Sequence, residues 1–178
     1  MLAAADALFA DADSPHTVSM DAIAAAAGVG KGTLFRAFGN REGLLDALWL
    51  AKLAALRAAV EQGEPPLGPG APAAERIVAF LDAVLSFKLD NRHLIRAREA
   101  SAGLRQSEHY RWMYGLLRRL VDEAAPQTED AGYAAHALLS ALHIDLVEEL
   151  LASGRSPQDI RGAQAAFTRA VIGARQPT

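Results

Sequence analysis

Apolar residues recur along the chain at intervals of three and four, the spacing that gathers them on one face of an α-helix. In the first 62 residues this spacing predicts four helices, over residues 2–10, 20–27, 31–38 and 41–62. No segment alternates apolar and polar residues between hairpin turns, so we expect an all-α fold without a β-sheet.

Residues with known preferences for helix ends mark the boundaries of these helices. Ser19 and Asn40 are suited to cap the second and the fourth helix, and Gly28 to end the second in a left-handed conformation. In the short third helix, Leu34 and Phe38 lie four residues apart, and we expect both in the core. The second and third helices, joined by a glycine turn, form a helix-turn-helix pattern.

A segment rich in proline and glycine, GEPPLGPGAP at residues 63–72, divides the chain. Beyond it the apolar spacing predicts five more helices, at about residues 73–90, 92–103, 107–124, 129–153 and 157–174. We therefore expect a helix-turn-helix domain over residues 1–48, with a connecting helix to about residue 62, and a second helical domain over residues 63–178.

The stretch GVGKGTLFRAF, residues 28–38, places three glycines where the third helix starts. Glycine costs a helix about 1 kcal/mol relative to alanine, so helix stability does not explain them. In a helix-turn-helix motif the second helix enters the major groove of DNA. We interpret Gly28 as the turn residue, and Gly30 and Gly32 as positions that leave the helix amides accessible to a phosphate. A nucleotide-binding phosphate loop would need another glycine spacing and a preceding strand.

The charge balance limits where nucleic acid could bind. The net charge is −3 at pH 7, which argues mildly against a nucleic-acid partner. The basic residues among the first 50 nevertheless cluster, because Lys31, Arg36 and Arg41 fall within eleven positions that hold no acidic residue. The positive potential is therefore local to the third helix and its flank.

Composition narrows the class of protein. With 51% hydrophobic and 22% charged residues the chain is globular, and with no cysteine it can form neither disulfides nor thiolate metal sites. The first ten residues hold no lysine or arginine, so we expect no secretory signal. The longest uncharged apolar run is too short to span a bilayer, and we expect a cytoplasmic protein without a membrane partner.

Residues 17–48, TVSMDAIAAAAGVGKGTLFRAFGNREGLLDAL, resemble the tetracycline-repressor (TetR-type) family of transcriptional regulators. The resemblance implies a three-helix DNA-binding domain, a connecting helix and a C-terminal domain that dimerises and often holds a small-molecule effector. Transferred residue by residue, it implies phosphate contacts at the entry to the second helix, groove-facing residues on the third, an aromatic residue beside the DNA backbone and a basic residue after it. The phosphate contacts would be Thr17 and Ser19, and the groove-facing residues Lys31, Gly32, Thr33 and Arg36. The aromatic residue would be Phe35 and the basic residue Arg41.

Some of these roles stay open, and the chain departs from the family pattern in three places. Arg36 could contact a base or a phosphate, and Arg41 a phosphate or only solvent. Gly30 stands where the family often has serine, which weakens the N-cap of the third helix. The loop at residues 11–16 is about one residue longer than usual. The family's basic N-terminal arm is missing before Met1, which implies modest DNA affinity or a shortened chain.

The sequence of the second predicted domain, residues 63–178, gives fewer indications of a ligand than the first domain gives of DNA. The resemblance places an effector cavity there, and aromatic, histidine and arginine side chains could line it, although each could equally pack in the core or lie on the surface. The candidates are Phe80, Phe87, His93, Arg96, Trp112 and His136. His136 and His143 are seven residues apart, too far for two histidines on one helix to share a metal, so we expect no metal and no cofactor.

The helix predicted over residues 129–153 carries more apolar surface than one neighbour could cover, and the last predicted helix presents apolar residues at helical spacing. Paired with the same helices of a second copy they would form a four-helix interface, as the family usually does. The interface candidates are Leu138, Ala141, Leu142, Leu146, Phe167 and Val171. In the alternative, both helices close the core of a single chain.

These features lead to one functional interpretation, with two alternatives. We expect a ligand-responsive transcriptional regulator, a repressor that binds a palindromic operator as a homodimer and is released by an unknown small-molecule effector. No catalytic constellation is recognisable, so we do not expect an enzyme. The alternatives are a helical enzyme or small-molecule carrier with a vestigial DNA-binding domain, and a regulator that acts through protein contacts without an effector.

Overall fold

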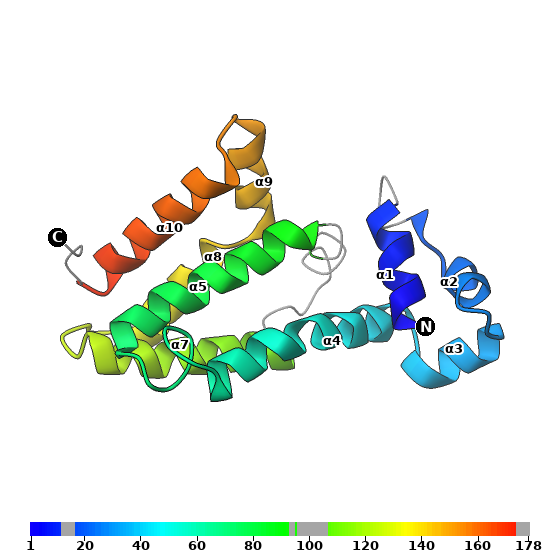
Figure 1. Cartoon of the computed structure of the whole chain (residues 1–178), viewed down its shortest axis with the longest axis horizontal. Coiled ribbons are helices and arrows are strands. Elements are labelled where there is room, and N and C mark those ends of the chain that lie inside the picture. The colour runs from blue at the N-terminus through cyan, green and yellow to red at the C-terminus, as the bar shows by residue number, and fades with distance from the viewer. Residues whose placement is uncertain (12–16, 93–94, 96–106, 174–178) are drawn as a thin grey trace. The chain divides into compact units, whose positions relative to one another are not determined.

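The computed structural model of the chain describes residues 1–11, 17–92, 95 and 107–173. Two compact units make up the chain, Met1–Ala54 with Asn91–Leu104, and Ala55–Asp90 with Arg105–Thr178. Within the described ranges there are helices and no β-strand, which confirms the all-α prediction (Figure 1). No helix in those ranges is long and apolar enough to cross a membrane.

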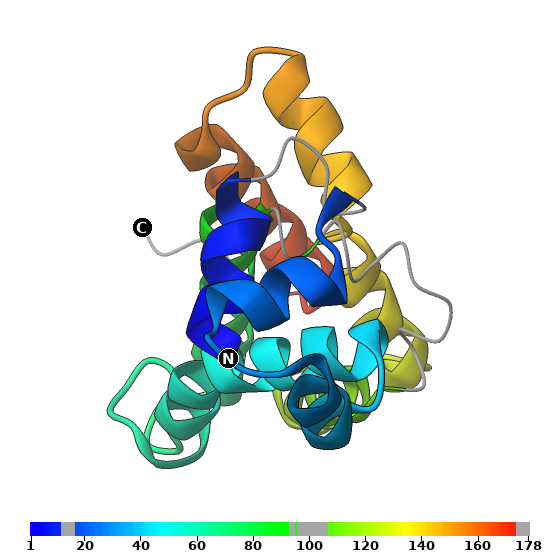
Figure 2. The ribbon, with the colours of Figure 1, turned by 90° about the vertical axis from the view of Figure 1, so that its right-hand side faces the viewer.

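The first unit is built from short helices packed in sequence order. Helix α1 (Leu2–Asp11) contacts α2 (Met20–Ala26), α2 contacts α3 (Lys31–Phe38), and the first part of α4 (Arg41–Gln62) completes the unit. Figure 2 views the chain from the side that carries α1, α2 and α3. The side chains that close its core are almost fully buried: Ala5, Phe9, Ile23, Leu34, Leu44, Leu45 and Leu48.

Local capping explains where these helices begin and end. The Ser19 hydroxyl accepts a hydrogen bond from the Ala22 amide at 3.1 Å. The Asn40 side chain accepts one from the Gly43 amide at 2.8 Å. Gly28 has a φ of +65°, the left-handed conformation that ends α2. These three predictions are confirmed, and Leu34 is buried as expected while Phe38 is half-buried.

The second unit packs the remaining helices around one apolar core. It comprises the end of α4 together with α5 (Ala73–Asp90), α7 (Glu108–Ala124), α8 (Ala131–Ser140), α9 (Ile144–Ala152) and α10 (Pro157–Val171). Helix α5 lies against both α7 and α10, and α7 lies against α8 (Figure 1). A capping box between Ser156 and Asp159 opens α10. The helix predicted over residues 92–103 falls almost entirely outside the described residues.

The prediction of one helix over residues 129–153 is wrong. Residues 141–143 interrupt it, and His143 has an extended backbone as the N-cap of α9. The Lys88 ammonium, on α5, donates to the Leu142 carbonyl at 2.7 Å in a buried position. This bond satisfies a carbonyl that a continuous helix would have paired internally. The break therefore depends on a partner 54 residues away in the sequence, and no glycine or proline marks it.

Candidate nucleic-acid interface

The start of α3 is bare of side chains at two positions, Gly30 and Gly32. Its N-cap is Gly30, which has an extended backbone and no side chain to accept from the helix amides. The Thr33 amide turns back to the Gly30 carbonyl at 2.9 Å, so the turn is formed by backbone alone. Amides at a helix N-terminus carry a partial positive charge and bind anions readily.

The two glycines at this helix start are not required by contacts within the described chain. A Cβ atom added at Gly30 or Gly32 would meet nothing within 4 Å. Neither residue has a positive φ, in contrast to Gly28. Their small size therefore leaves space on the outside of α3, where an approaching phosphate or base edge would lie.

Basic side chains surround this helix start. The Lys31 ammonium lies 2.8 and 2.9 Å from the two carboxylate oxygens of Asp21, on α2. The same ammonium is 5.9 Å from the ring centroid of Phe35, which is 38% exposed. One turn further, an Arg36 guanidinium nitrogen lies 3.5 Å from the Thr33 hydroxyl, a weak contact that leaves the guanidinium exposed.

Arg41 is placed differently from the other predicted DNA contacts. Its guanidinium lies 5.3 Å from the ring centroid of Phe9, and the residue is half-buried. This burial lowers the pKa of Arg41, but an arginine remains charged in proteins. Ser19 uses its acceptor to cap α2 and keeps a hydroxyl proton to donate. Ser19 and Thr17 are both exposed.

All eight predicted DNA contacts thus belong to the first unit. Seven of them are exposed and Arg41 is half-buried. The sequence analysis did not predict the contact of Lys31 with Asp21.

The structure describes four of the six predicted effector residues, and one of these, Trp112, lines the cleft described below. Phe80 is 1% exposed and packs edge-on against Trp112, with ring centroids 5.8 Å apart. Phe87 is half-buried on α5. His136 is exposed, stacked on Tyr114 at 4.2 Å. His93 and Arg96 lie outside the described residues.

A cleft of about 480 Å³ lies in the second unit, between the end of α4, α5 and α7. Trp112 is the one predicted effector residue among those that line it. Charged side chains from three helices contribute to its wall, so it is more polar than the pocket expected from the sequence. Its lining residues are Val60, Glu61, Pro69, Arg76, Trp112, Leu116, Arg119, Leu120 and Glu123.

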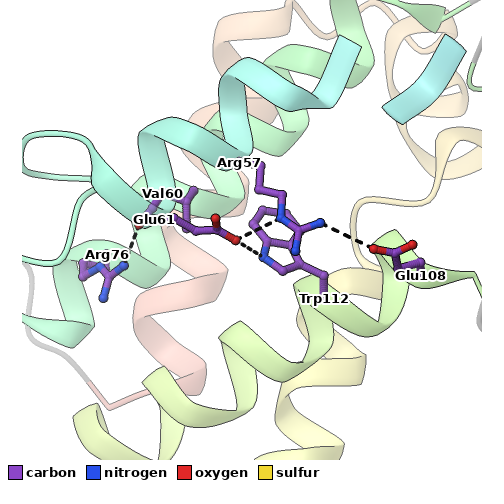
Figure 3. Close-up of polar contacts among 6 residues, drawn as sticks. All are labelled: Arg57, Val60, Glu61, Arg76, Glu108 and Trp112. Carbon is purple, nitrogen blue, oxygen red and sulfur yellow. Dashed lines mark hydrogen bonds and ion pairs between the residues drawn. The ribbon is translucent and has the colours of Figure 1, made fainter. Parts of the chain in front are cut away.

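A polar cluster beside this cleft joins α4 to α7 (Figure 3). A Glu61 carboxylate oxygen accepts from Arg57 at 2.9 Å and from the Trp112 indole nitrogen at 3.1 Å. The Arg57 guanidinium stacks 5.3 Å from the Trp112 ring centroid and reaches Glu108 at 3.7 Å. The hydrogen bond from Arg57 lowers the pKa of Glu61. The sequence interpretation missed this cluster, although Arg57 and Glu61 lie four residues apart on one helix.

The predicted dimer residues divide into two groups. Leu138 and Leu142 are 0% and 1% exposed within the single chain, so their side chains belong to its own core and this part of the prediction is corrected. Leu146 and Phe167 are 40% and 43% exposed, on α9 and α10. Ala141 and Val171 are half-buried. Leu138 lies on α8 and Leu142 in the break that follows it, and both pack inside the single chain.

The sequence and the fold both have known counterparts. Residues 1–48 match the family model for bacterial regulatory proteins of the tetR family. A TetR-like transcriptional regulator from Rhodococcus sp. RHA1 is 26% identical, with a TM-score of 0.64 over 97% of this chain and 93% of its own.

Two further solved structures are similar in fold. RolR, crystallised without ligand, is 20% identical with a TM-score of 0.67, over 99% of this chain and 97% of its own. The TetR family regulator PfmR from Thermus thermophilus is also 20% identical, with a TM-score of 0.57 over 99% of this chain and 98% of its own. No curated protein is significantly similar to the chain in sequence.

Proposed function

We propose that this chain, whose residues 1–48 match the family model for bacterial regulatory proteins of the tetR family, is a DNA-binding regulator that acts as a homodimeric repressor and is released by a small molecule. Each dimer would place two copies of α3 in successive major grooves of a palindromic operator, with half-sites about 34 Å or a related distance apart. The observation that carries the proposal is the bare start of α3. Gly30 and Gly32 leave the helix amides accessible to an anion there, and Lys31 adds a positive charge.

DNA binding of this kind is expected to depend steeply on salt. Neutralisation of phosphates releases counterions, so a protein with six to ten phosphate contacts loses about 10³- to 10⁵-fold in affinity between 50 and 200 mM salt. Fluorescence anisotropy of a labelled duplex over this range tests the proposal. Binding with no salt dependence, or no binding at 50 mM salt, would argue for the small-molecule carrier.

The support for a dimer is an exposed apolar set on the last three helices. Tyr133 on α8, Leu146 on α9 and Phe167 on α10 are 74%, 40% and 43% exposed. A contiguous exposed apolar patch marks a surface that another protein covers, and we propose that these three side chains belong to such a patch. A second copy of the chain is the partner that a palindromic operator requires.

The double substitution Leu146→Glu and Phe167→Glu is expected to convert a dimer into a monomer, because it buries unpaired charges from both copies in the proposed interface. Light scattering after size exclusion would show the mass of two 18.9 kDa chains for the parent and of one for the variant. Leu50→Glu is the matched control, since Leu50 is 42% exposed in the first unit. A parent protein that is monomeric at micromolar concentration would refute the dimer.

We place the effector in the second unit, in the cleft beside Trp112. The cleft has the volume of small-molecule sites, which is about 300–1,000 Å³, and Val60 and Glu61 of α4 form part of its wall. Helix α4 contributes residues to both units, and we propose that a ligand which shifts the end of α4 acts through this helix on the first unit. The proposed result is a changed spacing of the two α3 helices and loss of the operator.

A screen by thermal shift, followed by release of labelled DNA, tests the effector. A compound that stabilises the protein and lowers operator affinity supports the proposal. Trp112→Ala should abolish its binding while leaving DNA affinity unchanged. A compound that is chemically converted without any operator binding would favour the enzyme instead.

A further inference from the structure

We propose that Asp21 competes with DNA phosphate for Lys31 and thereby holds down the DNA affinity of this protein. The inference rests on the proposed DNA-binding function and assigns a role to the acidic partner of Lys31. It concerns side chains of the first unit alone.

The Lys31 ammonium already forms an ion pair with Asp21. Both carboxylate oxygens of Asp21 lie within 2.9 Å of the Lys31 ammonium. Lys31 is the first residue of α3, and Asp21 lies in the first turn of α2. The carboxylate thus sits beside the helix start where an incoming phosphate would be neutralised.

Exposure makes the exchange of partners feasible. The side chains of Lys31 and Asp21 are 62% and 63% exposed, so water and DNA reach both. The contact of Lys31 with the Phe35 ring, at 5.9 Å, keeps the ammonium over the outer face of α3 during an exchange. Surface pairs of this kind are weak, so a phosphate can displace the carboxylate, but it must first overcome their attraction.

The local charge balance points in the same direction. Lys31, Arg36 and Arg41 are the basic residues of the first 50 positions. With Lys31 paired, one of these three charges is cancelled in the free protein. Since phosphate neutralisation supplies the sequence-independent part of DNA affinity, Asp21 reduces that part for operator and other DNA alike.

Asp21→Asn is expected to raise the affinity for a random-sequence duplex about threefold at 50 mM salt. The amide keeps the size of the side chain and removes its charge. The gain should shrink as salt increases from 50 to 300 mM, because screening weakens the pair in the parent protein. Anisotropy with the full-length protein, from 50 to 300 mM salt, measures both effects.

Two comparisons separate the pair from a general change in charge. Asp122→Asn changes the net charge equally, at an exposed position on α7 of the second unit, and should leave affinity unchanged. In a Lys31→Ala background, Asp21→Asn should no longer raise DNA affinity threefold, because the ammonium for which Asp21 and phosphate compete is absent. Circular dichroism on each variant confirms that α2 and α3 are retained.

The outcomes distinguish this inference from the proposed function. An equal gain in the Lys31→Ala background would show direct repulsion between Asp21 and DNA, and would overturn the competition. A loss of affinity in Asp21→Asn would show that Asp21 positions Lys31 for DNA, and would overturn it as well. If the parent protein fails to bind DNA at all, the proposed function fails first.

Discussion

Joint removal of Lys31 and Arg41 is expected to weaken DNA binding about a hundredfold at 50 mM salt, because each loses a charge-assisted contact to phosphate. Lys31 is the first residue of α3 and Arg41 the first residue of α4, and we expect both to contact phosphate rather than a base. The double variant Lys31→Ala, Arg41→Ala should therefore weaken all DNA sequences by the same factor. The slope of log affinity against log salt should flatten by about 1.8, which is 0.9 for each phosphate no longer neutralised.

The measurement is an anisotropy titration at four salt concentrations with two unrelated duplexes. Arg118→Ala with Arg155→Ala is the matched control, since both are exposed cations of the second unit and the change in net charge is the same. Arg41 also stacks on Phe9, so thermal unfolding must show that the first unit remains folded. A change in sequence preference with an unchanged slope would mean that these residues read bases.

Replacement of Gly32 by alanine is expected to separate stability from function. Alanine favours a helix by about 1 kcal/mol over glycine, and the added Cβ meets nothing within 4 Å of the chain. Thermal stability should therefore rise. DNA affinity should nevertheless fall about tenfold, or about 1.4 kcal/mol, because the methyl group occupies the space through which DNA approaches the helix amides.

Gly115→Ala provides the control for this prediction. Gly115 lies within α7 of the second unit, where an added Cβ also meets nothing within 4 Å. It should gain stability similarly and leave DNA affinity unchanged. If Gly32→Ala bound DNA as well as the parent protein, the bare start of α3 would not be the DNA-facing surface.

The sequence was sufficient for the features that are set by neighbouring residues. Helices α3, α4 and α5 begin and end where the apolar spacing and the caps indicate, and Gly28 adopts the left-handed turn. A cap acts within one helical turn, and apolar periodicity spans a single element. Both can therefore be recognised without knowledge of the tertiary structure.

Features that depend on distant partners could not be predicted in the same way. In the break between α8 and α9 the Leu142 carbonyl accepts a hydrogen bond from Lys88, and no residue near position 142 in the sequence indicates this partner. The sequence around His136 does not indicate that the Tyr110 hydroxyl lies 2.9 Å from its Nδ1 atom. Neither residue lines the cleft. The direction of each aromatic side chain follows from how α5, α7 and α8 pack, and one sequence leaves that packing open.

Selection of bound sequences from a random double-stranded DNA library, at low salt and with the purified full-length protein, tests the central claim most directly. The account predicts recovery of a palindrome with half-sites about one helical turn apart, or a related spacing. Enriched sites should lose affinity when either half is scrambled, because two α3 helices are needed. Failure to enrich any sequence, with the protein folded and dimeric, would contradict the account and make small-molecule binding by the second unit the principal function.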